Sequence, residues 1–101
     1  MPKLYEYFGI VVFFYANEHE PVHVHGEYQG SESKAEILLV NGEITSIRIL
    51  RVPGRRPLRG SHLAHFKELV EHEAANIVKS WIDFFVLGKS VKSRKISRSL
   101  K

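Results

Sequence analysis

The dipeptide Asn41-Gly42 lies between two runs of strand-forming residues and restricts the fold more than any other feature of the chain. Both residues tolerate the positive φ that the two central positions of a type I′ turn require. The flanking runs, 34–40 (KAEILLV) and 43–52 (EITSIRILRV), are rich in β-branched and aliphatic side chains. The sequence therefore predicts an antiparallel hairpin, and with it a β-sheet.

Two further strands are expected before this hairpin. Residues 9–16 (GIVVFFYA) are mainly β-branched and aromatic without a polar interruption, as in a strand buried on both faces. Residues 22–28 (VHVHGEY) alternate strictly, so the valines share one face while His23 and His25 share the other. Pro21 has no N–H and ends the turn between the two strands. The second segment is thus predicted to be a half-buried strand with two imidazoles on its polar face.

The second half of the chain has the period of a helix. Apolar residues recur at intervals of three or four between His62 and Leu87, with Ser61 as a candidate N-cap and Gly88 just beyond the C-terminal end. A continuous helix of that length measures about 39 Å, so a break is expected near 73–76. The predicted fold class is α+β: a four-stranded, mostly antiparallel sheet, then a C-terminal helical segment (one broken helix or two helices) packed on one face.

Charge is distributed unevenly along the 101 residues, which make up one domain. Residues 89–101 carry six Lys or Arg and no acidic residue, whereas residues 1–88 are nearly neutral. We expect a single α+β domain over 1–88 and a basic C-terminal tail over 89–101. The tail is either a short helix that docks weakly or, as we favour, a disordered arm that attracts polyanions. The chain has no Cys, which excludes a disulfide scaffold and a thiol nucleophile. It shows neither a signal-peptide pattern nor a membrane-spanning run, so a cytoplasmic location is expected.

Three histidines within seven positions form the first candidate site. His23 and His25 project to one face of their strand, and His19 can reach them from the preceding turn. Such a set with one open position is a catalytic arrangement for zinc, so the candidate cofactor is a divalent metal such as zinc, and otherwise none is expected. The same histidines also suit acid–base chemistry without metal, or an ordinary surface strand whose glutamates pair with histidine in water. The glutamates available to orient the rings are Glu18, Glu20 and Glu27.

Five arginines, with no acidic residue among them, form the second candidate site. Guanidinium groups bind phosphate in a two-pronged geometry, so a loop that carries several of them suits an RNA or DNA backbone. An exposed loop with two Pro and a Gly must also be polar for reasons unrelated to function. The predicted nucleic-acid-binding residues are Arg48, Arg51, Arg55, Arg56 and Arg59.

The N-terminal residues resemble a known family. The segment FGIVV at 8–12, followed by Y-x-x-E-H-x-P-x-H-x-H at 15–25, is similar to a small prokaryotic family catalogued as domain of unknown function 4160. The segment WIDFF at 81–85 and the basic tail also look like this family, so the resemblance covers nearly the whole chain. It implies no activity. It does imply short bacterial or archaeal proteins whose genes often neighbour another small uncharacterised domain, as in toxin–antitoxin pairs.

Two functional hypotheses from different classes follow. The first is a partner- or nucleic-acid-binding component of a toxin–antitoxin-like gene pair, with a small protein from a neighbouring gene and RNA or DNA as partners, and with no membrane partner. The alternative is a histidine-based divalent-metal-binding or metal-dependent hydrolytic module, in which the ion activates water. The sequence identifies no catalytic residue and leaves open the oligomeric state and whether the protein is an enzyme.

Overall fold

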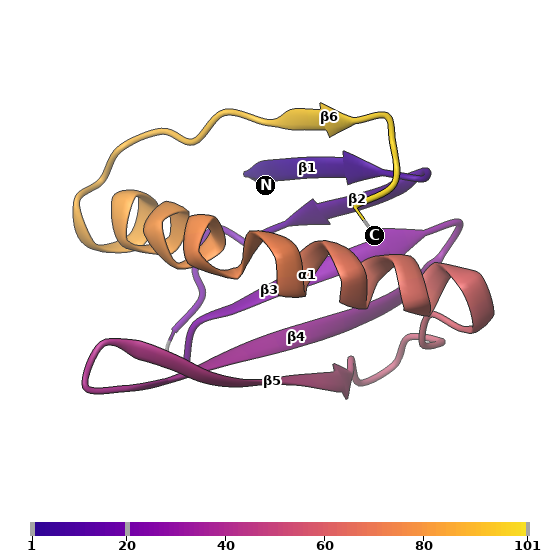
Figure 1. The fold of residues 1–101 in the computed structure, drawn as a ribbon, viewed down its shortest axis with the longest axis horizontal. Coiled ribbons are helices and arrows are strands. Elements are labelled where there is room, and N and C mark those ends of the chain that lie inside the picture. The colour runs from indigo at the N-terminus through magenta and orange to yellow at the C-terminus, as the bar shows by residue number, and fades with distance from the viewer. Residues whose placement is uncertain (1, 20, 101) are drawn as a thin grey trace.

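The computed structural model, drawn in Figure 1, is a six-stranded sheet with one long helix across one face. It describes residues 2–19 and 21–100. The helical segments are α1 (Gly60–Trp81) and, continuing from it, the short π-helix η1 (Ile82–Val86). The strands are β1 (Lys3–Tyr7), β2 (Ile10–Phe13), β3 (His23–Tyr28), β4 (Ser31–Val40), β5 (Glu43–Arg51) and β6 (Arg94–Ile96), in the spatial order β5-β4-β3-β2-β1-β6. The α+β class and the helix packed on the sheet are confirmed.

The sheet has six strands rather than the predicted four, and one addition lies at the N-terminus. β1 pairs antiparallel with β2 through a tight turn at Phe8 and Gly9, whose φ values are 49° and 80°. Phe8 is 50% exposed because it forms this turn. The apolar run 9–16 is therefore a strand only over its first half, since the chain leaves the sheet after Phe13.

The second additional strand comes from the basic tail, and it makes the sheet mixed. β6 runs parallel to β1, whereas the other neighbouring strands are antiparallel. Ile96 and Leu100 pack against the core, and the Leu100 N–H donates to the Tyr7 hydroxyl at 3.0 Å. The prediction of a disordered arm is wrong here because β1 offers unpaired backbone groups that a short apolar-containing segment can bind.

The hairpin prediction is confirmed. Asn41 and Gly42 have φ values of 52° and 80°, and they connect β4 to β5. β4 begins at Ser31, three residues before the predicted start, because the polar residues there are buried with partners. Ser33, for example, accepts the Leu58 N–H at 3.0 Å through its hydroxyl.

The expected break in the helix is absent from the predicted place. α1 runs without interruption through 73–76, and the backbone departs from α geometry only at η1. Glu73 is buried in this stretch, yet its carboxylate accepts the Tyr5 hydroxyl at 2.9 Å and the Asn76 amide at 3.2 Å, so no break is needed. Arg59 rather than the predicted Ser61 is the N-cap residue, and no side chain caps the first turn. None of the described helices is long and apolar enough to cross a membrane.

A glycine brings the helix close to the sheet. A Cβ on Gly26 would lie 2.6 Å from the Phe66 ring, so Gly26 faces α1 and leaves room for that ring. By alternation, His25 faces the opposite side of the sheet. It is nevertheless buried, as are Val24 and His23. β3 is thus covered on both faces, and the prediction of a half-buried strand with a polar, solvent-facing side is wrong.

Candidate metal centre

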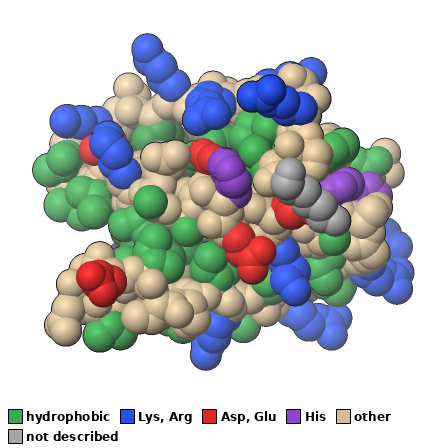
Figure 2. Space-filling view, viewed as in Figure 1, with side chains coloured by type: hydrophobic (Ala, Val, Ile, Leu, Met, Phe, Trp, Pro, Cys, Tyr) green, Lys and Arg blue, Asp and Glu red, His purple; other side chains and the backbone are tan. Residues whose placement is uncertain are grey.

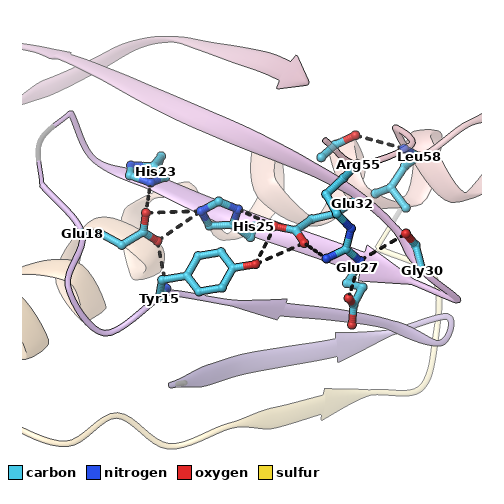
Figure 3. Close-up of polar contacts among 10 residues, drawn as sticks. Tyr15, Glu18, His23, His25, Glu27, Gly30, Glu32, Arg55 and Leu58 are labelled. Carbon is cyan, nitrogen blue, oxygen red and sulfur yellow. Dashed lines mark hydrogen bonds and ion pairs between the residues drawn. The ribbon is translucent and has the colours of Figure 1, made fainter. Parts of the chain in front are cut away.

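The connection between β2 and β3 places one carboxylate against both histidines of β3 (Figure 3). The Tyr15 N–H donates to Glu18 at 2.8 Å, which turns the Glu18 side chain back towards the sheet. The other oxygen of the carboxylate contacts the Nε2 of His23, and the two oxygens lie 3.2 and 3.3 Å from the Nε2 of His25. The three side chains offer ligand atoms that lie within 4.8 Å of one another.

Each imidazole is oriented through its other ring nitrogen. The Nδ1 of His23 lies 2.8 Å from the carbonyl oxygen of Pro21, which can only accept, so this nitrogen carries a proton. The Nδ1 of His25 lies 3.0 Å from the carboxylate of Glu32. Metal-binding histidines typically donate their second ring nitrogen to a backbone carbonyl or a carboxylate in this way. Both Nε2 atoms are thereby aimed at one point.

A chain of charges continues from His25 along the sheet (Figure 3). Glu32 is fully buried; the Tyr15 hydroxyl donates to both of its oxygens, at 3.0 and 3.2 Å. Arg55 lies 3.1 Å from Glu32 and 2.8 Å from Glu27, so its guanidinium joins two carboxylates. The predicted role of Arg55 in nucleic-acid binding is not supported by this placement, because its charge is already paired.

The site is nearly closed to solvent. The side chains of Glu18, His23 and His25 are 11%, 10% and 6% exposed. Tyr15 lies edge-on to the His25 ring at 4.6 Å, and the Phe13 ring stacks on it at 5.5 Å. Burial alone raises the pKa of Glu18, but the Tyr15 N–H and the two imidazoles lower that pKa by more, so the carboxyl is more acidic than usual.

Two of the three predicted metal ligands are brought together. His23 and His25 converge as predicted, whereas His19 is exposed and lies outside the cluster. Glu18, which the sequence suggested only as a residue that orients a ring, is the third member of the cluster instead. Glu27 pairs with arginine rather than with histidine. The third suggested glutamate, Glu20, lies outside the described residues.

Sequence reasoning missed Glu32 and Tyr15. Glu32 lies in a polar stretch after a glycine that resembles a loop. The available signal was the alternation in β4, which places Glu32 on the same face as Glu36 once the strand is extended towards Ser31.

The arginines do not form one surface. Arg48 pairs with Glu36 at 3.1 Å on the face of the sheet opposite α1, whereas alternation puts the exposed Arg51 on the other face. Arg56 and Arg59 lie further on, beside a cavity near the start of α1. Figure 2 agrees for the face it shows, where Lys and Arg side chains are spread around the rim.

The fold and this cluster define a small α+β domain that carries a histidine–glutamate site on the sheet face opposite its helix. The chain belongs to the family described as Domain of unknown function (DUF4160), whose model matches residues 9–82. This confirms the resemblance drawn from the sequence, and the matched segment contains the whole cluster. No curated protein and no solved structure matches the chain significantly.

Proposed function

We propose that this protein binds one divalent transition-metal ion of the zinc type through Glu18, His23 and His25. The observation that carries the proposal is that both ring nitrogens of His25 face carboxylates, Glu32 at 3.0 Å and Glu18 at 3.2 Å. A neutral imidazole carries a single N–H. In a neutral His25 ring, one of the two nitrogens therefore has no proton and still faces a carboxylate. This conflict is removed if a cation lies between that nitrogen and the carboxylate, or if the ring is protonated.

His23 shows the same conflict, because both of its ring nitrogens also face acceptors. Its Nδ1 proton is committed to the carbonyl of Pro21, so the Nε2 of the neutral ring presents a lone pair to the Glu18 carboxylate. Two acceptors in contact repel each other. A metal ion bound by the carboxylate and both Nε2 atoms removes the conflict at both histidines.

Two charged imidazoles are the competing explanation. The two rings are 5.2 Å apart and almost fully buried, so two imidazolium ions would repel each other at short range. Taking each such ion out of water costs several kcal/mol. One divalent ion supplies the same two positive charges against Glu18 and Glu32 while both rings stay neutral, the form in which histidine binds metals.

The donor set fits zinc. Two imidazole nitrogens and one carboxylate are the protein ligands of several catalytic zinc sites, which keep a fourth position for water. A zinc-bound water ionises near pH 7, about where it becomes a useful nucleophile. A divalent ion held by Glu18, His23 and His25 would supply an activated water for hydrolysis, and EDTA would then abolish any hydrolytic activity of the protein.

The test is metal binding by the untagged full chain. We expect about one zinc per chain by elemental analysis and by calorimetric titration. Glu18→Gln and His25→Gln keep side-chain size and are expected to weaken zinc binding by about a hundredfold, since even outer-shell partners contribute about 10–100-fold. His19→Ala is the matched control and should leave zinc affinity unchanged.

Three outcomes contradict the proposal. Wild-type protein that is folded by circular dichroism and binds no zinc, manganese or nickel excludes the site. Full affinity in folded Glu18→Gln also excludes it. A loss in His19→Ala as large as that in Glu18→Gln would instead favour the three-histidine set predicted from the sequence.

A second candidate function is a partner- or nucleic-acid-binding role in a toxin–antitoxin-like pair. The observation that favours it is that the side chains of Arg56 and Arg59 have no ion pair or hydrogen bond within the described part of the chain, while most basic residues of 89–101 are exposed. If phosphate contacts dominate, RNA affinity should fall steeply with added salt. RNA affinity that is absent or independent of salt counts against the nucleic-acid role, and co-expression with the product of the neighbouring gene tests the protein partner.

A further inference from the structure

A cavity of about 340 Å³ lies where the turn between β3 and β4, the loop after β5 and the start of α1 meet. It is on a different part of the molecule from the histidine–glutamate cluster and shares no residue with it. Its volume falls at the lower end of the range for small-molecule sites. The polar and aromatic side chains that line it are Tyr28, Gln29, Ser31, Arg56, Arg59 and His62.

The charged side chains that line this cavity are two arginines, Arg56 and Arg59. No carboxylate of the described residues lines it. Arg48 and Arg55 each have a glutamate partner within 3.1 Å, but Arg56 and Arg59 have none within the described ranges. Two unpaired guanidinium groups at a concave surface focus a positive potential and attract anions. Planar guanidinium groups bind the oxygens of phosphate or carboxylate in pairs, so the cavity suits an oxyanion of this kind.

The loop that carries these arginines is fixed before any ligand arrives. The Arg56 carbonyl accepts the Glu32 N–H at 2.8 Å, and the Leu58 N–H donates to the Ser33 hydroxyl at 3.0 Å. Leu58 is itself buried in the core. Because the backbone is already ordered, binding an anion restricts only side chains, which keeps its entropic cost small.

One wall of the cavity is formed by the aromatic side chains of Tyr28 and His62. The rings of Tyr28 and His62 stack with their centroids 3.8 Å apart and their planes 22° from parallel. Nucleobases and sugars pack on such surfaces beside a bound phosphate. The cavity therefore combines groups suited to a phosphate with a surface suited to the rest of a nucleotide.

We propose that this cavity binds the phosphate group of a nucleotide, held by Arg56 and Arg59 beside the Tyr28–His62 wall. This cavity would be the binding site in the second candidate function. The proposal depends on that function only if the ligand is RNA. A free mononucleotide and an RNA strand present the same phosphate ester, so the experiment must separate them.

The experiment titrates the full-length protein with inorganic phosphate, adenosine 5′-monophosphate and a 5′-phosphorylated single-stranded RNA oligonucleotide, each in low salt. Arg56→Ala and Arg59→Ala are each expected to weaken binding of the mononucleotide by about tenfold or more, as for loss of a charge-assisted bond. Lys67→Ala is the matched control, because it removes an exposed positive charge on α1 that does not line the cavity. Thermal melts confirm that the three variants are folded.

The outcomes separate this proposal from the nucleic-acid function. Mononucleotide binding that is lost in Arg56→Ala and Arg59→Ala but kept in Lys67→Ala supports the cavity, even if RNA does not bind. Mononucleotide binding that all three variants retain overturns the cavity, and RNA binding that they also retain leaves the nucleic-acid function standing at another surface. Failure of all three probes to bind the wild type overturns the cavity as well.

Discussion

Glu32 is an acidic side chain at a position that its neighbours in the sequence suggest is exposed. It follows Gly30 and Ser31, yet it is fully buried. Its carboxylate interacts with Tyr15, His25 and Arg55, which come from three different segments of the chain. A buried carboxylate is stable only when it is paired and hydrogen-bonded. Since those partners are distant in sequence, no local pattern reports the burial of Glu32.

Glu73, on α1, is a second buried acidic residue. It accepts hydrogen bonds from Tyr5 at 2.9 Å and Asn76 at 3.2 Å, and it lies 2.9 Å from the Nδ1 of His72. Burial raises the pKa of Glu73, but the contacts with His72, Asn76 and Tyr5 lower it by more, and its pKa lies below the ordinary 4.5. The ionised form is therefore the one that the folded state stabilises.

This predicts an acid-sensitive contribution to stability. A group whose pKa is lower in the folded state stabilises the fold above its unfolded pKa and stops doing so as the pH falls through its folded pKa. Glu73→Gln should lower the free energy of unfolding by about 1–3 kcal/mol at neutral pH. The difference from wild type should shrink between about pH 5 and pH 3.

Urea unfolding of both proteins across this pH range provides the measurement. Glu71→Gln, at an exposed position on the same helix, is the control and should show little difference at any pH. A Glu73→Gln deficit that stays constant down to the lowest pH would contradict the role assigned to the ionised carboxylate.

The contact between β3 and α1 depends on the absence of a side chain at Gly26. The Phe66 ring occupies the place where a Cβ would lie, at 2.6 Å. Gly26→Ala should push the helix away from the sheet and lower the free energy of unfolding by about 1–3 kcal/mol, as for other overpacked cores. Chemical denaturation measures this loss.

A second substitution distinguishes two causes of the lost stability, namely overpacking against Phe66 and the reduced backbone freedom of alanine. Gly26→Ala combined with Phe66→Leu should be more stable than the sum of the two single effects predicts, because the smaller side chain makes room for the added methyl group. Additive losses in the double variant would show that the Phe66 ring is not the cause.

β6 shows how an edge position can order a short basic segment. Three residues form the strand, and most of the segment around them is exposed. Pairing with β1 and the packing of Ile96 and Leu100 hold it against the domain. The sequence of this segment alone predicts disorder, because the residues that it contacts lie near the opposite end of the chain.

Across the molecule, α1 lies over one face of the sheet, and the connection between β2 and β3 passes the ends of these strands next to the histidines (Figures 1 and 3). The metal proposed here joins that connection, through Glu18, to two residues of β3. Zinc should therefore stabilise the whole domain, because the unfolded chain holds no preformed site.

Thermal unfolding tests this coupling. Free zinc at about 100 times its dissociation constant should add about 2.7 kcal/mol to the free energy of unfolding. The melting temperature of wild type should rise with zinc and return after EDTA, while that of Glu18→Gln should rise much less. An equal rise in both proteins would mean that zinc acts elsewhere.

Much of the fold follows from patterns that are local in the sequence. The Asn41-Gly42 hairpin and the alternation that aligns His23 with His25 depend on backbone preferences and on the period of a strand. The helical period of the second half is likewise a local pattern. These features need no knowledge of distant residues, and the structure contains all of them.

The sequence alone determined the α+β class, the family and the histidine pair, because residue type and spacing along a single element are enough to specify them. The tertiary structure decided that Glu18 rather than His19 joins the pair and that Glu32 lies beneath His25. It also decided that Arg55 is paired while Arg56 and Arg59, without an ion pair among the described residues, line a cavity. These outcomes depend on contacts between segments distant in sequence, where burial and charge pairing select the partners.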